Sequence, residues 1–358
     1  MALSRPLVSV VVPCFNAGRM LQPALRSVIE QTYPDIEIIF VDNNSTDESA
    51  KIAREVLEAS NRPFHLVGCP EPGANHARNV GYSLASGEFI QWMDADDLLE
   101  PDKIERQIAA FRSNPDIDIA YGDWTSHRFQ LNGPPLLRNH TLHQENDQRL
   151  RTLAGIWYPP HLYLIKRDVA DRLQHEQAWW PTCKVATDVE YSAKAALLDF
   201  RFQHVPGARV HYNIWSTEQI SGSVPYEKRA ASLKAIYERL KAFTAAHNLE
   251  GTLSRRHQMF LNQNWDLWHL PAKSMLVEKL PGRWYQLVQP KTKNALKVRP
   301  ADADLAKALM GRPPRALLHH ALMLAGSSPD LPRDPVVAFE AIDGFRQAGL
   351  LTLAALTH

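Results

Sequence analysis

The first half of the chain alternates between short apolar runs rich in β-branched residues and segments with apolar residues at helical spacing. The apolar runs predict strands at residues 7–12, 36–41, 64–67 and 88–93, and the helical spacing predicts helices at residues 19–31, 46–59, 74–85 and 101–111. This alternation is typical of a mostly parallel sheet with helices on both faces. The sequence therefore predicts an α/β fold in which the carboxyl ends of several strands share one edge of the sheet.

Three carboxylates follow directly after the fourth predicted strand. Asp94, Asp96 and Asp97 lie within four positions, and like charges this close repel one another. A cation would neutralise them, and Asp94 and Asp96, which share a face of an extended chain, offer the oxygen ligands that Mg²⁺ or Mn²⁺ prefers. Asp97 has a second interpretation, because it can open the helix that follows Pro101. The cluster predicts a divalent-metal site, and an ion held there can hold a diphosphate.

Polar residues also follow the first and second predicted strands, at residues 13–16 (Pro-Cys-Phe-Asn) and 42–45 (Asp-Asn-Asn-Ser). In open α/β sheets ligands bind beyond the carboxyl ends of strands, so the clusters should converge at one edge. The preference of such residues for turns explains each cluster separately. It does not explain why an Asp directly follows two of the strands. Gly73 precedes a helix whose N-terminus, together with Arg78, can bind an anion; a solvated surface arginine is the alternative.

Composition limits the compartment and the partners. The formal net charge of +1 gives the whole chain no attraction to nucleic acid, and we expect no nucleic-acid partner. The three cysteines, Cys14, Cys69 and Cys183, are far apart and odd in number, which favours a reducing compartment. No stretch approaches 18 apolar residues, the length of a transmembrane helix. We therefore expect a cytoplasmic protein.

Four motifs lie in register, at residues 10–16 (VVVPCFN), 41–47 (VDNNSTD), 77–81 (ARNVG) and 93–97 (MDADD). They resemble those of the inverting family 2 glycosyltransferases of GT-A fold, of the type that builds bacterial surface polysaccharides. Each motif is short, but their order and spacing match the family as well. The resemblance covers about residues 5–225 and implies a nucleotide-diphosphate-sugar transferase fold.

The resemblance implies a site for a nucleotide-diphosphate sugar, with UDP-sugars favoured, and Mn²⁺ or Mg²⁺ as cofactor. Pro13 and Asn16 would border the base, and Asp42 would accept a hydrogen bond from it. Asp94 would contact the ribose or the metal, and Asp96 would ligate the metal through the donor's diphosphate. The full set of donor-binding residues implied is Pro13, Phe15, Asn16, Asp42, Asn44, Arg78, Asp94 and Ala95.

The family's general base is an acid in a Glu-Asp pair ahead of an amphipathic helix. Thr187-Asp188 occupies that place, so the resemblance implies Asp188 as the base, with Thr187 where Glu is usual. Glu190 is the competing candidate, and a helix N-cap is the structural alternative for Asp188. Many members also have a Tyr-Arg-x-His segment after this helix, whereas residues 212–215 read Tyr-Asn-Ile-Trp. His211 is then the candidate for a further metal ligand, with an ordinary polar role as its alternative.

These residues predict displacement at an anomeric carbon with inversion. The metal would stabilise charge on the departing diphosphate, which makes Asp96 a catalytic residue. Asp188 would take the proton of an acceptor hydroxyl, a contribution of roughly 10²–10⁴-fold. The acceptor would be a saccharide or a lipid-linked saccharide. A single addition is favoured, because the Gln-x-x-Arg-Trp motif of processive synthases is incomplete: Arg283-Trp284 is present, but Leu280 stands at the first position.

Two other classes compete with a transferase. A catalytically degenerate protein on the same scaffold, which binds a nucleotide sugar or a glycan, is supported by Thr187, Asn213 and Trp215. A dinucleotide-dependent oxidoreductase is weaker, because no Gly-x-Gly-x-x-Gly follows the first predicted strand.

Aromatic residues ahead of Asp188 suggest an acceptor surface. Trp179 and Trp180 lie shortly before that carboxylate, and aromatic faces stack well on the apolar faces of sugar rings. Ordinary core packing is the alternative for each tryptophan.

Helical spacing of apolar residues dominates beyond Pro225, with expected helices at residues 233–243, 253–268, 316–324 and 336–350. We therefore expect a catalytic domain of residues 1–224 and a mainly α-helical C-terminal region of residues 225–358.

A basic stretch, residues 271–315, holds ten Lys and Arg residues against three acids, with Trp284 and Tyr285 inside it. Docking on an anionic membrane, where a lipid-linked acceptor lies, is one interpretation. A solvated face packed on the catalytic domain is the other. The first would make the protein peripheral on the inner face of the membrane.

Overall fold

The computed structural model describes residues 5–130, 133–156, 158–183, 186–215 and 226–262, together with short strands at 268–269, 276–279, 285–288, 295–298 and 352–353. The chain divides into two compact units, Met1–Gln148 with Trp157–Ser223, and Arg149–Ile156 with Val224–His358. The second unit thus takes in Arg149–Ile156, which the expected division at residue 224 placed in the first domain.

A mixed sheet of nine described strands forms the first unit, in the order β3-β2-β1-β4-β8-β6-β9-β5, with β7 paired to β6. The strands are β1 (Val8–Cys14), β2 (Ile36–Asp42), β3 (Phe64–Gly68), β4 (Phe89–Trp92), β5 (Leu98–Leu99), β6 (Ile119–Arg128), β7 (Leu136–His140), β8 (Tyr163–Lys166) and β9 (Phe202–Ile214). Among these strands, β5, β7 and β8 run against the direction that the other six share. The prediction of a mostly parallel α/β sheet is confirmed.

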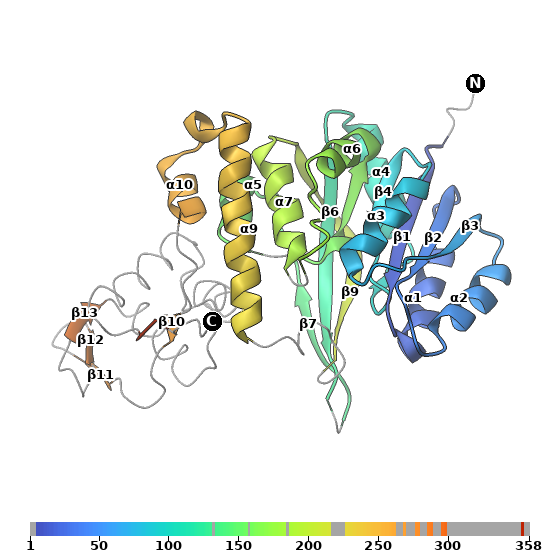
Figure 1. Ribbon diagram of the computed structural model, residues 1–358, viewed down its shortest axis with the longest axis horizontal. Helices are drawn as coiled ribbons and strands as arrows, with labels where there is room; N and C mark the ends of the chain where they lie inside the picture. Colours follow the sequence, from blue (N-terminus) through green and yellow to red (C-terminus); the bar gives the residue numbers. More distant parts are fainter. Residues whose placement is uncertain are drawn as a thin grey trace. The chain divides into compact units, whose positions relative to one another are not determined.

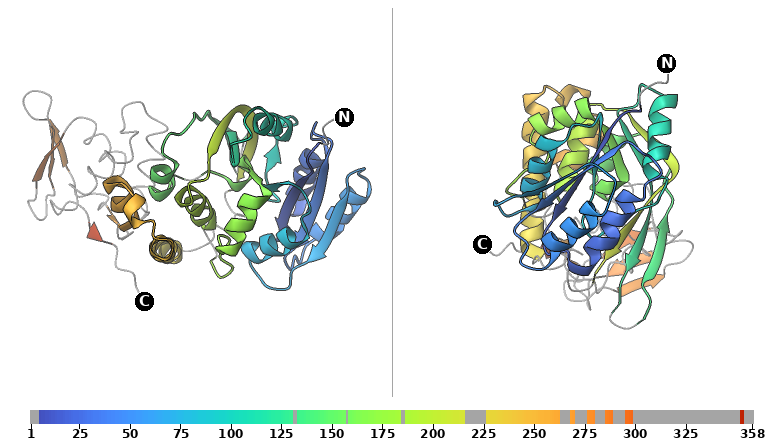
Figure 2. Two further views of the ribbon diagram at one scale, coloured as in Figure 1. Left: turned by 90° about the horizontal axis from the view of Figure 1, so that it is seen from above. Right: turned by 90° about the vertical axis from the view of Figure 1, so that its right-hand side faces the viewer.

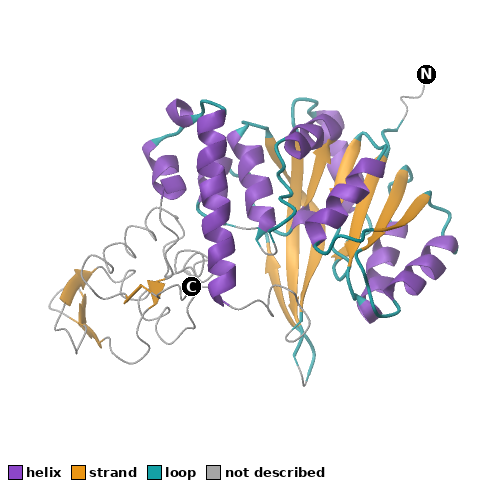
Figure 3. Ribbon diagram, viewed as in Figure 1, coloured by secondary structure: helices purple, strands orange, loops and turns teal. Residues whose placement is uncertain are grey.

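Helices cover both faces of this sheet (Figures 1 and 3). They are α1 (Leu21–Ile29), α2 (Ser49–Glu58), α3 (Ala74–Leu84), α4 (Lys103–Ser113), α6 (Arg167–His175) and α7 (Thr187–Leu197). The chain moves outward from β1 to β3 through α1 and α2, and returns to β4 through α3. Because parallel crossovers are right-handed, α3 lies on the face opposite to α1 and α2, an arrangement that can be followed in the two views of Figure 2.

Strands β1, β2 and β3 end level with one another, and β4 ends three residues earlier in the register, which positions the site. Cys14 at the end of β1 pairs with Asp42 of β2, and Asp42 pairs with Gly68 of β3. Trp92, the last residue of β4, pairs with Val11 of β1. Every residue of β1 is buried, so the polar residues that follow these strands are the first that can leave the core.

The second unit contains α9 (Tyr226–Ala246), α10 (Arg255–Asn262) and, apart from its first residue, α5 (Gln148–Leu153). Strands β11 (Leu276–Lys279), β12 (Tyr285–Val288) and β13 (Ala295–Val298) form an antiparallel sheet inside the basic stretch, and β10 (Trp268–His269) pairs with β14 (Thr352–Leu353). The helical prediction therefore holds for α9 and α10, while these strands were not expected.

Other predictions for the C-terminal region lie outside the described residues, namely the helices at 316–324 and 336–350 and the side chain of Trp284. Within the described part of the chain, no helix has the length and apolar character needed to cross a membrane.

Gly81 allows α3 to lie close against the sheet. A Cβ atom at this position would come within 2.5 Å of Val11 Cγ1 and 3.0 Å of Val41 Cγ2. We predict that Gly81→Ala lowers the free energy of unfolding by about 1–3 kcal/mol through overpacking, although alanine favours helix. Urea unfolding measures this, with Ser83→Ala on the exposed side of α3 as the control. A Gly81→Ala variant as stable as the control variant would contradict the close packing.

Candidate functional site

The loops after β1 and β2 are joined by hydrogen bonds, as their shared edge predicts. Asn16 adopts a left-handed backbone with φ 49°, a conformation that asparagine tolerates. Its backbone N–H donates to Ser45 Oγ at 3.0 Å, and its side-chain oxygen accepts from the Thr46 backbone N–H at 2.7 Å. Asp42 Oδ1 accepts from the Ser45 N–H at 3.2 Å. The two strand-end clusters therefore form one structure, beside which Phe15 is 48% exposed.

Two asparagines after Asp42 hold the loop that leads into α3. Asn43 donates to the carbonyls of Cys69 and Glu71 and accepts from the Gly73 N–H at 2.7 Å. The Asn44 amide donates to the carbonyls of Cys69 and Pro70 at 3.1 and 3.0 Å. The Asn44 side-chain N–H groups, expected to serve the donor, thus hold this loop in place.

Arg78 connects α3 to the acidic loop after β4. Its Nη2 donates to Asp94 Oδ1 at 2.7 Å, its Nη1 donates to Asn75 Oδ1 at 2.9 Å, and its guanidinium carbon lies 4.5 Å from the ring centroid of Trp179. The Arg78 residue is only 8% exposed. The alternative of a solvated surface arginine is therefore wrong, because a buried guanidinium requires these charged and aromatic partners.

Asn75 extends this connection to the segment that carries Asp188. Its amide nitrogen donates to the Trp180 carbonyl at 2.8 Å, and its Oδ1 also accepts from Thr187 Oγ1 at 3.1 Å. A hydrogen-bonded chain of four side chains, Thr187–Asn75–Arg78–Asp94, therefore ties the start of α7 to the acidic loop. Thr187 is part of this chain through its hydroxyl, at the position where the resemblance expects Glu.

Asp188 lies in the first turn of α7, whose N-cap residue is Ala186. The N-cap alternative for Asp188 is therefore wrong. Asp188 is a partly exposed residue, but protein atoms crowd around its carboxyl, and this desolvation raises its pKa to about 7. Arg78 opposes the rise and the negative charge of Asp94 adds to it, because both side chains lie near this carboxyl.

Glu190, the competing candidate for the base, is committed elsewhere. Its Oε1 lies 2.7 Å from Lys194 Nζ one helical turn later, and both side chains are almost completely buried. A carboxylate enclosed with its counter-charge in this way is a packing element of α7.

The acidic loop is braced from β9. The Asn213 backbone N–H donates to Asp97 Oδ1 at 2.7 Å, and its side-chain amide donates to the Asp96 carbonyl at 2.6 Å. Asp97 is 1% exposed and precedes β5, whereas α4 begins at Lys103. The interpretation of Asp97 as a helix-start residue is therefore wrong. Burial and the neighbouring Asp94 raise the pKa of Asp96 to about 7, as expected for crowded carboxyl groups.

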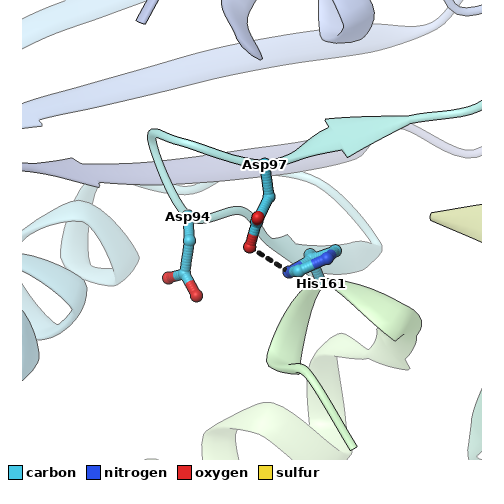
Figure 4. A group of neighbouring side chains, drawn as sticks. All are labelled: Asp94, Asp97 and His161. Atoms are coloured by element: carbon cyan, nitrogen blue, oxygen red, sulfur yellow. Dashed lines mark ion pairs between the residues drawn. The ribbon is translucent and has the colours of Figure 1, made fainter. Parts of the chain in front are cut away.

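His161 is a site residue that the sequence analysis missed. It comes from the short helical turn Pro160–Leu162, and ligand atoms of Asp94, Asp97 and His161 lie within 4.8 Å of one another (Figure 4). His161 is fully buried, and burial lowers its pKa to about 3, so the imidazole is neutral. His161 lies 64 residues beyond Asp97, so the sequence did not indicate that the two side chains are neighbours. Only the fold brings η2 (Pro160–Leu162) to the acidic loop.

His211, the expected further metal ligand, has other partners. Its Nε2 lies 2.6 Å from Glu100 Oε1, and its Nδ1 lies 2.8 Å from His127 Nε2. Asp96 and His211 are both outside the group of three potential ligands around Asp97.

The expectation for Trp179 needs correction. This side chain is 2% exposed, stacks on Tyr191 with ring centroids 4.5 Å apart, and packs against Trp92 and Arg78. No face of the Trp179 ring remains free for a sugar ring. Trp179 instead packs against the Arg78 guanidinium. Trp180 is partly exposed, and the acceptor prediction rests on it alone.

We predict that Arg78 and Asp94 are energetically coupled in the folded protein. Arg78→Met and Asp94→Asn should each lower the free energy of unfolding by roughly 1–3 kcal/mol, and the double variant should lose about 1 kcal/mol less than the sum. Urea unfolding of the four proteins gives the coupling energy. The exposed pair Arg54–Glu58, at 3.4 Å, is the control and should couple by less than about 0.5 kcal/mol. Additive single effects at Arg78 and Asp94 would contradict the proposed contact.

The chain is similar to known glycosyltransferases. Residues 9–173 match the family model described as glycosyl transferase family 2. Glycosyltransferase GlyG of Streptococcus pneumoniae is 37% identical over 118 residues, which are 33% of this chain and 39% of that protein. The putative teichuronic acid biosynthesis glycosyltransferase TuaG of Bacillus subtilis is 36% identical over 105 residues, which are 29% of this chain and 41% of that protein. The chain thus spans about two fifths of these relatives' lengths.

The fold has a counterpart among solved structures. The crystal structure of S. aureus TarS 1-349 aligns with a TM-score of 0.51 at 19% identity, over 73% of this chain and 71% of that one. A likeness at this identity speaks for the fold alone, and that fold is the GT-A fold. Residues 9–173 are therefore similar to glycosyl transferase family 2, and the fold that carries them is the GT-A fold.

Proposed function

We propose that the protein is a metal-dependent inverting glycosyltransferase that moves one sugar from a nucleotide-diphosphate donor, with a UDP-sugar favoured, to a hydroxyl of a saccharide or lipid-linked saccharide in surface-glycan synthesis. The observation that carries this proposal is the tie between Asp188 and the acidic loop through Thr187, Asn75 and Arg78. A base and a diphosphate-binding loop must face the same small volume for this reaction, and the hydrogen-bonded chain holds them together. A TarS structure in complex with UDP-GlcNAc and the name of TuaG support the donor and the pathway class.

The residues fit a divalent cation. Burial, and then repulsion among the three neighbouring carboxyl groups, raise the pKa values of Asp96 and Asp97, while Arg78 pairs with Asp94. A cation held by Asp94 and its neighbours would supply Lewis-acid stabilisation of the departing diphosphate. Arg78 would orient Asp94 and add positive charge near the diphosphate. Asp42 and Asn16 would border the base, and Asp188 would accept the proton of the attacking hydroxyl.

The structure weakens the case for a degenerate binding protein. Thr187 and Asn213 supported that alternative as departures from the family pattern, yet both make hydrogen bonds that order the site. Trp215, the third departure, stacks on Phe129 with ring centroids 3.7 Å apart. Three predictions from the sequence extend the proposal: a cytoplasmic location, docking of residues 271–315 on an anionic membrane, and an acceptor contact at Trp180. Co-sedimentation with anionic vesicles tests the membrane docking.

Donor binding is the first test. A thermal-shift panel of UDP, GDP, CDP and ADP with Mn²⁺ should show the largest rise in Tm with UDP, since a ligand at about 100 times its Kd adds about 2.7 kcal/mol to native-state stability. An Asp94→Asn variant should lose most of the shift. If no nucleoside diphosphate raises Tm in either protein, the donor assignment is wrong.

Removing the base should separate chemistry from binding. We predict that Asp188→Asn folds and binds the nucleotide with unchanged affinity, while kcat for sugar transfer falls roughly 10²–10⁴-fold because the amide cannot accept the proton. Steady-state kinetics and calorimetry measure the two quantities. Asp116→Asn, at an exposed position, is the matched control and should leave both unchanged. Near-normal turnover of Asp188→Asn would remove Asp188 as the base.

The pH dependence follows from the raised pKa of Asp188. The base works only as a carboxylate, so kcat/KM should fall about tenfold per pH unit below a pKa near 7 and level off above it. A bound cation would lower this pKa, so the profile is measured at several Mn²⁺ concentrations. A profile that is flat from about pH 5.5 to 8.5 would contradict a base titrating in this range.

A further inference from the structure

The hairpin formed by β6 and β7 exposes two consecutive leucines. Leu136 and Leu137 are 58% and 62% exposed, which makes them the most exposed large apolar side chains in the described part of the chain. Neighbouring residues of a strand point to opposite faces. In the β6–β7 pairing, Leu136 lies opposite Arg128 and Leu137 lies opposite His127. The hairpin therefore presents an exposed apolar side chain on each of its faces.

The same hairpin carries basic groups and no acid. Residues 124–144 contain Arg128 and Arg138 but neither Asp nor Glu, although acidic and basic residues are almost equal in number over the whole chain, 39 against 40. Arg128 is exposed beside Leu136, its partner in the pairing. Exposed leucines next to arginine favour a binding partner that is both apolar and negatively charged.

The hairpin leaves the sheet at the edge where the candidate site lies. Strand β6 runs parallel to β1 and β4, because β4 and β6 are both antiparallel to β8. His127 of β6 pairs with Asn213 of β9, the residue that holds the Asp96 carbonyl and the Asp97 carboxylate. From Arg128 onward the hairpin continues past this level, toward the foot of Figure 1. A surface that binds the hairpin therefore lies on the side of the acidic loop.

The base of the hairpin is fastened to the loops of this edge. The Phe129 backbone N–H donates to the Ile214 carbonyl at 2.9 Å, and the Phe129 ring stacks on Trp215 with centroids 3.7 Å apart. On Trp215 in turn lies Arg19, whose guanidinium carbon is 5.5 Å from the ring centroid. Arg19 belongs to η1 (Gly18–Met20), which follows β1. Direct contacts thus connect the hairpin to the loop that carries Asn16.

A lipid bilayer fits these features better than a protein partner does. A protein surface that packs on one face of the hairpin leaves the leucine of the other face in water. The interface of a bilayer surrounds an inserted tip on all sides, and anionic headgroups attract arginine. The rival occupant is a second copy of this chain, because β7 pairs with β6 alone among the described strands and edge strands can add a strand. Such backbone pairing needs neither leucine.

We propose that residues 128–130 and 133–138 form a docking element that inserts into the interface of a bilayer containing anionic phospholipid. Docking there brings the carboxyl edge of the sheet to the membrane. This surface belongs to the first unit and is distinct from the basic stretch 271–315. Only the purpose of docking, access to a lipid-linked acceptor, rests on the proposed function.

Co-sedimentation of the full-length protein with phosphatidylcholine vesicles, with and without phosphatidylglycerol, tests the docking. The unaltered protein should bind the anionic vesicles more tightly. The double variant Leu136→Ser/Leu137→Ser should lower the partition coefficient about 10-fold or more, because two apolar side chains no longer leave water. Arg128→Gln should lower it about 5-fold on anionic vesicles only. Leu84→Ser, at another exposed leucine, on α3, is the matched control and should bind as the unaltered protein does.

A fluorescent label shows whether the hairpin itself enters the bilayer. The native cysteines Cys14, Cys69 and Cys183 are buried, so a nitrobenzoxadiazole group attached to a Leu137→Cys variant reports on the hairpin. Its emission should shift to the blue and gain intensity when anionic vesicles are added, because the group leaves water. The same label on a Leu84→Cys variant should show neither change.

Three outcomes would overturn the proposal. Absence of vesicle binding by the unaltered protein is the first. Vesicle binding that the double serine variant retains, or an unshifted label at residue 137 on bound vesicles, would assign membrane docking to residues 271–315 instead. Concentration-dependent self-association without vesicle binding would assign the hairpin to a second copy. Because both leucines are exposed, the variants should unfold in urea at the midpoint of the unaltered protein, so a loss of binding is not a loss of fold.

The result is separable from the proposed function. Vesicle binding through the hairpin without any sugar transfer removes only the transferase. Sugar transfer to a soluble acceptor without vesicle binding removes only the docking element.

Discussion

The crowding of three carboxyl groups in the Asp94–Asp97 loop is the constraint on which the rest of the site depends. Their mutual repulsion at a strand end has to be met by partners from other elements, and the fold supplies those partners on both sides. From α3, Arg78 reaches Asp94, and from β9, Asn213 holds Asp96 and Asp97. A loop held from two directions has a defined shape before any ligand arrives, which is the condition for precise placement of a diphosphate.

The departures from the family pattern acquire physical roles in this arrangement. Thr187 reaches Arg78 through Asn75, and Asn213 braces the acidic loop. Each replacement substitutes a short polar side chain whose hydrogen bonds are satisfied. This is the expected result when a site stays ordered while its sequence varies, because buried polar groups are retained only with partners.

Local patterns were enough to predict the elements and the edge where they meet. The run at residues 7–12 and the spacing at residues 74–85 correspond to β1 and α3 within two residues. The joining of the loops that carry Asn16 and Asp42 followed from parallel strands alone. Glu190 and Lys194 stand four residues apart, so their pairing was readable as a helical ion pair and would have removed Glu190 as a base at once.

Contacts between segments that are far apart in the chain could not be predicted from the sequence. Nothing local distinguishes Trp179, which packs under Arg78, from its neighbour Trp180, because burial is decided by how the segment before α7 lies on α3. The role of Asp97 depended on a two-residue strand, β5, that is too short to show periodicity. His161 became a candidate only when η2 was placed beside the acidic loop.

The most direct test of the account is a crystal structure of the protein with Mn²⁺ and UDP, with anomalous diffraction recorded at the manganese edge. We predict an anomalous peak beside the Asp94 carboxylate, bonded to the diphosphate and on the side that Arg78 and Asp188 share. A manganese peak remote from Asp94, or nucleotide bound away from the carboxyl ends of β1, β2 and β4, would contradict it.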